Sequence, residues 1–412
     1  MSSPLARRAF LQQMSLLGFG AWAGFSRSGF AEEMVELPFA NGTRPLVKYP
    51  QKRPLIRLTS RPPQLETPFS VFNEGVITPN DAFFVRYHLS NIPLEIDVEK
   101  FRVAVDGKVN TPLSLSVADL KKDFEAVEVV AVNQCSGNSR GFFQPRVAGG
   151  QLGHGAMGNA RWRGARLKDV LEKAGVAAGA KQVSFDGLDT PVIDKTPDFI
   201  KALEIDHAID GEVLLAYEMN GEDLPMLNGY PLRLVVPGYY GTYWVKHLSK
   251  ITVLDEVFSG FWMGTAYRIP DTDGACVMPG TTPKSTVPIK RFNVRSFITS
   301  HTDGAVVKAN DLTTIRGIAF DGGNGIAEVL FSPNGGKVWF NTQLGEDLGK
   351  YSFREWTMKL RIGEKPGPSE WKVRATNRVG ESQPLEPLWN PSGYMLNVVE
   401  TTRVTITGES TI

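Results

Sequence analysis

Cysteine, paired metal-binding motifs and several cofactor motifs are scarce or absent in this sequence. Its 412 residues include two cysteines and five histidines, without a C-x-x-C pair or the spacing of a zinc site. There is no C-x-x-C-H segment for covalent attachment of a c-type haem, and no G-x-G-x-x-G follows a predicted strand. These absences argue against a structural zinc site, a c-type haem in this chain and a nicotinamide cofactor bound through that motif.

The chain also lacks an excess of charge and a hydrophobic run of membrane-spanning length. Lysine and arginine total 45, aspartate and glutamate total 44, and the formal net charge is +1. This balance predicts no nucleic-acid partner, and any anionic ligand must be bound by a local cluster of cations. The apolar run after Arg7 and Arg8 is shorter than the about 20 residues of a transmembrane helix. We therefore expect no membrane anchor.

The amino-terminal segment instead has the composition of an export signal. A twin arginine precedes the short apolar run, and the small residue Ala31 follows it as a candidate cleavage position. We therefore interpret residues 1–31 as a twin-arginine export signal and expect a periplasmic protein. A chance pair of arginines at the amino terminus is the alternative.

Composition and periodicity divide the rest of the chain into three parts. Residues 32–100 are rich in proline and predict an extended segment that wraps over a core. Residues 101–285 predict a mixed α+β domain, with a helix over 165–174 that stops at Gly175. Its predicted strands cover 101–109, 126–132, 182–185, 213–217 and 232–236.

The pattern becomes purely β after a linker rich in proline and threonine. Residues 286–412 have turn signals about every eight to twelve residues, and Asn-Gly-Gly at 334–336 predicts a hairpin. We expect an immunoglobulin-like β-sandwich, without its inter-sheet disulfide because neither cysteine lies in this segment.

Three local clusters carry candidate chemistry. In N-Q-C-S-G-N-S-R, residues 133–140, Cys135 follows a predicted buried strand, and it is either disulfide-bonded to Cys276 or retained to bind a ligand. Residues 80–88 predict a strand in which Arg86 and His88 share a face, which is also compatible with a surface pair. Residues 227–247 combine a glycine-rich turn with two cations, a pattern that suits an anion but also occurs in ordinary turns.

Together these clusters resemble the sulfite oxidase family of molybdopterin enzymes. The matching segments are F-F-V-R-Y-H (83–88), C-S-G-N-S-R (135–140) and G-Y-P-L-R-L-V-V-P-G-Y-Y-G-T-Y-W-V-K (229–246). The segments A-Y-E-M-N-G (216–221), T-A-Y-R-I-P (265–270) and P-L-W-N-P-S-G-Y (387–394) also fit. The resemblance implies a fold of class α+β: a molybdopterin domain that starts within 32–100 and spans 101–285, then an immunoglobulin-like dimerisation domain over 286–412.

The resemblance also implies roles for individual residues. Cys135 is implied to be the protein ligand of molybdenum, and a soft thiolate suits such a metal. The catalytic positions implied are Arg86, His88, Cys135, Arg140 and Tyr267. The cofactor-binding positions implied are Phe84, His88, Cys135, Asp189, Asn228, Arg233, Trp244, Val245 and Lys246. Asn228 and Tyr243 stand where the vertebrate enzymes of this family carry histidine and arginine.

The function implied is molybdenum-dependent oxidation of sulfite to sulfate, with one molybdopterin-bound molybdenum per chain. The sequence has no H-P-G-G haem-binding segment, so we expect no haem in this chain and electron transfer to a separate c-type cytochrome. We also expect a homodimer. The alternatives are a sulfane dehydrogenase subunit of thiosulfate oxidation, a methionine sulfoxide reductase of the same superfamily, and a non-enzymatic β-sandwich binding protein.

Overall fold

The computed structural model describes residues 33–37 and 41–408. The chain divides into two compact units, Met1–Glu33 and Met34–Ile412, and the description below concerns the second. The predicted export signal, residues 1–31, lies outside the described residues. Among those described, no helix has the length and apolar character needed to cross a membrane.

The segment before residue 100 contains a β-sheet, which its proline-rich composition did not predict. Five short strands pair in chain order: β1 (Met34–Leu37), β2 (Gly42–Val47), β3 (Leu55–Ser60), β4 (Pro63–Glu66) and β5 (Val85–Arg86). Leu55, Leu65 and Val85 pack against Leu227 in a small core of their own. Pro63 begins a strand, one of the positions where a sheet tolerates proline. The expected strand over 80–88 is reduced to the two residues of β5.

Two further sheets make up the first large domain, with few and short helices. One has the order β11-β10-β15-β6-β7 and the other β13-β12-β9-β8, with β14 paired to β12. The strands of the first are β6 (Val103–Gly107), β7 (Leu113–Leu115), β10 (Gln182–Asp186), β11 (Lys201–Glu204) and β15 (Lys250–Leu254). Those of the second are β8 (Ala126–Gln134), β9 (Met157–Arg166), β12 (Leu214–Met219), β13 (Glu222–Asp223) and β14 (Arg233–Val235). The described α-helices are α2 (Val117–Asp123), α3 (Leu167–Ala174), α4 (Ile205–Ala208) and α5 (Phe261–Gly264), so the α+β expectation overstates the helical content.

Helix α3 and strand β8 confirm two local predictions. Leu167, Val170 and Leu171 are fully buried on one face of α3, as their spacing predicts. Gly175 ends the helix in the left-handed region, with φ of 71°, and its N–H contacts the carbonyls of the last turn. Strand β8 extends two residues beyond its predicted end, so that Cys135 follows it directly.

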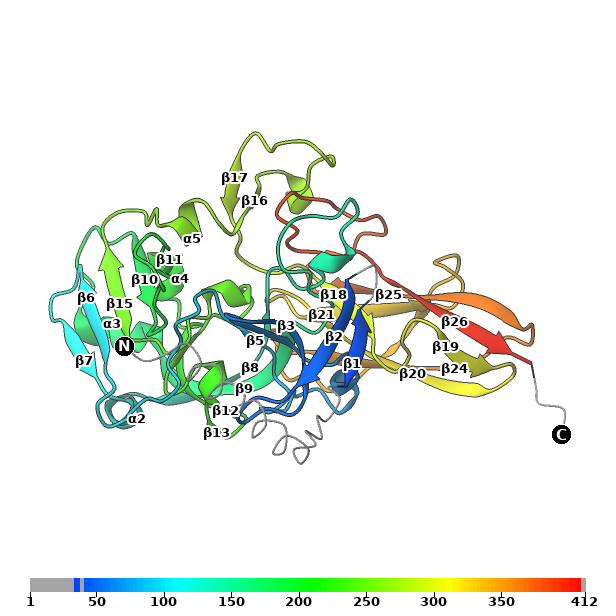
Figure 1. Ribbon diagram of the computed structural model, residues 1–412, viewed down its shortest axis with the longest axis horizontal. Coiled ribbons are helices and arrows are strands. Elements are labelled where there is room, and N and C mark those ends of the chain that lie inside the picture. Colours follow the sequence, from blue (N-terminus) through cyan, green and yellow to red (C-terminus); the bar gives the residue numbers. More distant parts are fainter. Residues whose placement is uncertain (1–32, 38–40, 409–412) are drawn as a thin grey trace, which may run out of the picture. The chain divides into compact units, whose positions relative to one another are not determined.

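The carboxyl-terminal domain consists of two sheets around one core (Figure 1, yellow to red). The first has the order β18-β20-β24-β23, with bounds Arg295–Ile298, Leu312–Phe320, Arg354–Arg361 and Gln343–Leu344. The second has the order β19-β26-β25-β21-β22, with bounds Ala305–Lys308, Thr401–Thr407, Gly367–Asn377, Ile326–Ser332 and Phe340–Asn341. Trp356 of the first sheet and Trp371 of the second share a core. The hairpin predicted at Asn-Gly-Gly is confirmed, because β21 and β22 pair antiparallel on either side of it.

A two-stranded ribbon connects the two domains along the chain. Its strands are β16 (Arg268–Pro270) and β17 (Thr286–Pro288). Tyr267 directly precedes this ribbon, in a left-handed backbone conformation with φ of 57°. A bulky residue adopts that conformation rarely, so the surrounding packing must hold it.

Candidate active site

One cavity gathers most of the residues that the sequence singled out. Of the twelve predicted site residues, the cavity wall includes all except Arg140 and Val245. Those in the wall are Phe84, Arg86, His88, Cys135, Asp189, Asn228, Arg233, Trp244, Lys246 and Tyr267. Segments that are far apart in sequence therefore meet at one place.

Cys135 reaches this cavity from the end of β8, on a tightly bonded loop. Its N–H donates to the carbonyl of Ala156 at 2.9 Å, and its own carbonyl accepts from the N–H of Asn138 at 2.9 Å. The side chain of Asn138 in turn accepts from the N–H of Ala156 at 3.0 Å. Both cysteines are free, so the disulfide between Cys135 and Cys276 is not formed. The loop thus fixes a buried thiol in the cavity wall.

Positive charge dominates the cavity wall. Arg86, Arg233 and Lys246 all line it, whereas Asp189 is the one acidic side chain among the lining residues. Burial lowers the pKa of Arg233 to about 9, which leaves it a cation at neutral pH. Burial also lowers the pKa of Lys246 well below its usual value, and the neighbouring Arg233 adds to this effect. Cations buried without a counter-charge destabilise the empty site, and a bound anion would offset that cost.

Several polar atoms of the wall have no protein partner. The side chains of Asn133, Ser136 and Thr242 and the Nε of Arg233 are buried without a hydrogen bond in the described part of the chain. Buried polar groups in native proteins are nearly always satisfied. Donors and acceptors of this kind, beside a soft thiol and three cations, fit a polar, phosphate-bearing pterin with a thiophilic metal.

Asn133, Ser136 and Thr242 were not among the predicted site residues. The sequence did hold a signal for them, because two flank Cys135 and the third lies within the glycine-rich segment 229–246. What the motifs did not show was that their polar atoms lack partners inside the protein.

His88 and Tyr267 form an aromatic pair at one side of the cavity. The Nε2 of His88 is hydrogen-bonded to the hydroxyl of Tyr267. Phe199 stacks on the imidazole at 3.7 Å between ring centroids and 9° between planes. Burial first, and then the charges of Arg86, Lys246 and Lys201, hold the pKa of His88 well below its usual value. The imidazole is therefore neutral at physiological pH.

Asn228 has a side chain that forms hydrogen bonds to two other parts of the protein. Its Oδ1 accepts from Nζ of Lys52 at 2.5 Å, and its Nδ2 donates to the carbonyl of Phe84 at 3.1 Å. The backbone carbonyl of Asn228 accepts from Arg233 at 3.0 Å. Asn228 thus orients Arg233 and the segment around Phe84, while its amide keeps a second N–H in the cavity wall.

Arg140 and Val245, the two predicted residues outside the wall, lie close behind it. The guanidinium of Arg140 lies over the ring of Tyr394, which stacks in turn on Tyr267. Val245 is buried and contributes its backbone, with its carbonyl accepting from Leu234 at 2.9 Å. Tyr394 was not predicted as a site residue, although it ends the matching segment 387–394.

The cysteine loop is also bonded to the second domain. Residues 137–141 read G-N-S-R-G, the pattern of a hydrolase nucleophile elbow. Ser139 pairs with His154 at 2.7 Å, and His154 lies 2.9 Å from Glu400. However, Ser139 is fully buried, lies outside the cavity wall and accepts a hydrogen bond from Arg295. This network anchors the loop and does not present a nucleophile.

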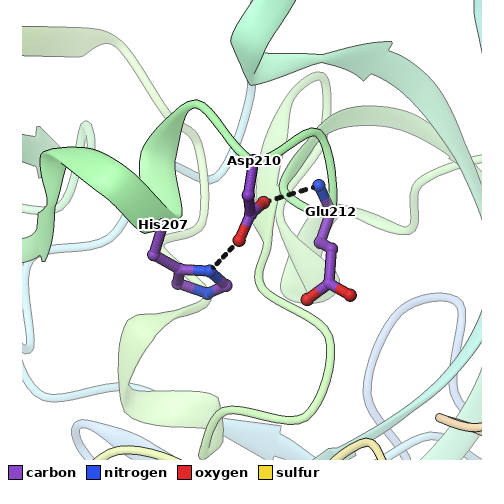
Figure 2. A group of neighbouring side chains, drawn as sticks. All are labelled: His207, Asp210 and Glu212. Atoms are coloured by element: carbon purple, nitrogen blue, oxygen red, sulfur yellow. Dashed lines mark hydrogen bonds and ion pairs between the residues drawn. The ribbon is translucent and has the colours of Figure 1, made fainter.

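A second group of ligand-type side chains, His207, Asp210 and Glu212 (Figure 2), is not among the residues that line the cavity. Asp210 bonds the Nδ1 of His207 at 2.5 Å. Glu212 is paired with Lys350 at 2.7 Å and with Arg291 at 3.4 Å. Two cations therefore already balance the Glu212 carboxylate, and ion pairing accounts for the group.

The matches to known protein families and relatives cover most of the chain. The oxidoreductase molybdopterin binding domain matches residues 88–262, and the Mo-co oxidoreductase dimerisation domain matches residues 286–407. Mitochondrial sulfite oxidase of Mus musculus is 34% identical over 377 residues, which is 87% of this chain and 67% of that protein. Sulfite oxidase of Arabidopsis thaliana is 30% identical over 384 residues, which is 87% of this chain and 96% of that protein.

A solved structure shows the same fold over almost the whole chain. The sulfane dehydrogenase SoxCD from Paracoccus pantotrophus superposes with a TM-score of 0.69 at 22% identity, covering 97% of this chain and 96% of that one. At that identity the likeness concerns the fold alone. The family matches and the sulfite oxidase relatives go further: this chain belongs to the sulfite oxidase family of molybdopterin oxidoreductases.

Proposed function

We propose that this protein oxidises sulfite to sulfate at a molybdopterin-bound molybdenum whose protein ligand is Cys135. The observation that carries the proposal is the meeting, in one cavity, of the buried Cys135 thiol, three cations and polar atoms without protein partners. The identity to sulfite oxidases supports the choice of substrate.

The residues around the cavity divide into two groups by what they bind. Arg233 and Lys246 hold the phosphate of the pterin, with the unpaired Nε of Arg233 as one donor. Trp244 and the fixed backbone around Val245 and Phe84 shape its pocket. The metal centre, when bound, supplies the oxygen-atom transfer and takes up the two electrons released by sulfite.

The second group binds the substrate anion. Arg86 donates charge-assisted hydrogen bonds to sulfite, which is a mixture of monoanion and dianion near neutral pH, and Arg140 supports the same site from behind Tyr394. The hydroxyl of Tyr267, held by neutral His88, offers a further hydrogen bond at the reacting oxygen. Because the imidazole of His88 and the hydroxyl of Tyr267 stay neutral at physiological pH, they orient the anion without adding or removing charge.

We further propose the setting in which this reaction takes place. The twin arginine ahead of a short apolar run supports export to the periplasm, and a separate c-type cytochrome there takes the electrons. The match to a Mo-co dimerisation domain supports a homodimer formed through residues 286–407.

One experiment tests the family chemistry and the substrate together. Molybdenum content and sulfite-dependent reduction of a c-type cytochrome or ferricyanide are measured on the same purified sample. About one molybdenum per chain with sulfite turnover is the expected result. Molybdenum without sulfite turnover would reject sulfite as substrate and favour sulfane sulfur, and a folded sample that cannot be loaded with molybdenum would reject the proposal.

A further inference from the structure

Lys201 is a buried cation that the proposed function leaves unused. It begins strand β11 and is fully buried, at 0% exposure. Its Nζ donates one hydrogen bond, to the carbonyl of Trp262 at 2.6 Å. Burial lowers its pKa to about 7, and no carboxylate in the described part of the chain offsets this effect. A buried ammonium without a carboxylate is costly, so Lys201 keeps its proton at neutral pH more readily when an anion lies nearby.

The surroundings of Lys201 belong to the proposed substrate side of the cavity. Its Nζ lies 5.2 Å from the ring centroid of Tyr267 and 4.6 Å from that of Tyr243. Phe199, two residues earlier in the chain, stacks on His88, and Trp262 packs edge-on against the same imidazole. Lys201 thus lies directly behind the aromatic groups that form the cavity wall.

The electrostatic field of Lys201 reaches the cavity itself. After burial, the charges that lower the pKa of His88 are those of Arg86, Lys246 and Lys201. Two of these three cations line the cavity, and the third stands behind Tyr267. An anion beside Arg86 and His88 would therefore feel the charge of Lys201 through a poorly solvated wall.

We propose that Lys201 is a positioning and charge-selecting residue, which holds Tyr267 from behind and favours doubly charged oxyanions in the cavity. This inference rests on the proposed function, because it treats the cavity as the binding site of such an anion. Lys201 does not touch the substrate. Its charge acts across the ring of Tyr267, and the bound dianion supplies the counter-charge that the protein lacks.

Two tetrahedral anions of similar size test the charge selection without any turnover. Sulfate carries two charges and perchlorate one, and neither changes protonation at pH 6, where Lys201 is protonated. Their dissociation constants are measured by fluorescence titration of the full chain, as wild type and as Lys201→Met. We expect the constant for sulfate to rise about tenfold and that for perchlorate about threefold, since Coulomb energy scales with the ligand charge.

Two further variants separate charge from structure. Lys201→Gln keeps a donor for the Trp262 carbonyl and loses the charge, so it should repeat the loss of selectivity even if Lys201→Met folds poorly. Lys195→Met removes an exposed lysine from the preceding loop and should leave both constants unchanged. Equal effects on sulfate and perchlorate, unchanged selectivity in Lys201→Gln, or a wild type that binds neither anion would overturn the inference.

The kinetic readout keeps this inference distinct from the proposed function. In Lys201→Met the KM for sulfite should rise with the sulfate constant, whereas kcat per bound molybdenum should change less than about threefold. A protein that shows the charge selectivity but no sulfite turnover would retain the role of Lys201 and reject sulfite oxidation. A protein that turns over sulfite, but whose Lys201 variants keep the wild-type selectivity, would retain sulfite oxidation and reject the role of Lys201.

Discussion

The guanidinium of Arg140 lies over the ring of Tyr394, with its Cζ 4.9 Å from the ring centroid. Tyr394 belongs to the segment between β25 and β26 of the carboxyl-terminal domain, and it stacks on Tyr267 at 5.4 Å and 10°. Tyr267 in turn lines the cavity. The second domain therefore supports the substrate side of the site, in addition to any part it has in dimerisation.

This stack predicts that Tyr394 affects substrate binding from outside the cavity. We expect Tyr394→Leu to raise the KM for sulfite about 3- to 10-fold, because stacked aromatic and cation–π contacts are each worth about 0.5–1.5 kcal/mol. Tyr394→Phe keeps the ring and should change KM less. Steady-state kinetics normalised to molybdenum content would check this, and an unchanged KM in Tyr394→Leu would contradict it.

Arg86 should contribute a larger share of substrate binding. We expect Arg86→Gln to lower kcat/KM for sulfite by about tenfold or more, mainly through KM, since a charge-assisted hydrogen bond is worth about 1.5–3 kcal/mol. Arg86→Lys keeps the charge without the planar fork, so an intermediate loss is expected. If Arg86→Gln retains the wild-type kcat/KM, Arg86 does not bind the substrate.

The role of Cys135 is tested by a substitution that hardly changes the size of the side chain. Cys135→Ser should abolish sulfite turnover, because an alcohol is a poor ligand for a thiophilic metal. Cys276→Ser is the matched control. Cys276 lies outside the cavity wall and contacts the carbonyl of Asp273 at 3.5 Å, so this variant should retain activity. A fully active Cys135→Ser protein would remove the basis of the assignment.

Local patterns could be predicted from the sequence, whereas contacts between distant segments could not. The spacing of Leu167, Val170 and Leu171 fixed helix α3, because one apolar face and a terminal glycine are local features. The small amino-terminal sheet was missed, since its strands are short and Leu65 and Val85 gain their core only by packing on Leu227. Proline there was read as irregular chain, although the edges and ends of strands tolerate it.

In the candidate site, too, local motifs could be predicted from the sequence, whereas contacts between distant segments could not. Short motifs placed Cys135, Arg233 and Lys246 among the site residues, and the structure puts all three in one cavity wall. Arg140 shares a motif with Cys135 but lies against Tyr394, because the second domain approaches the loop there. Lys201 carries no motif at all. Its burial and its distance from Tyr267 are properties of the folded chain, and no local sequence pattern predicts them.

Glu66 is a buried acid whose protonation should make stability depend on pH. It lies at the end of β4 with 1% exposure, its Oε1 has no hydrogen-bond partner among the described residues, and the backbone of Gly153 bonds its carboxyl group. Burial raises its pKa from 4.5 to about 8. The folded protein therefore keeps this proton up to about pH 8, while the unfolded chain releases it near pH 4.5.

The sign of the effect follows from which state holds the proton. Between pH 4.5 and about 8 the folded state binds more protons at Glu66, so the free energy of unfolding falls as pH rises. The slope from one group is at most about 1.4 kcal/mol per pH unit. Glu66→Gln is uncharged at every pH. Its free energy of unfolding should therefore increase relative to that of the wild type as pH rises from 5 to 8.

Denaturant unfolding of both proteins at pH 5, 6.5 and 8 measures this difference. We expect the two to differ least at pH 5 and most at pH 8, with Glu66→Gln the more stable there. Because Glu66 contacts the backbone of Gly153, whose carbonyl accepts from the N–H of Ser139, ionisation should also loosen the cysteine loop. Parallel stability curves across this range would mean that the carboxyl ionises at its ordinary pH in the folded protein, and that Glu66 is reached by water despite its burial.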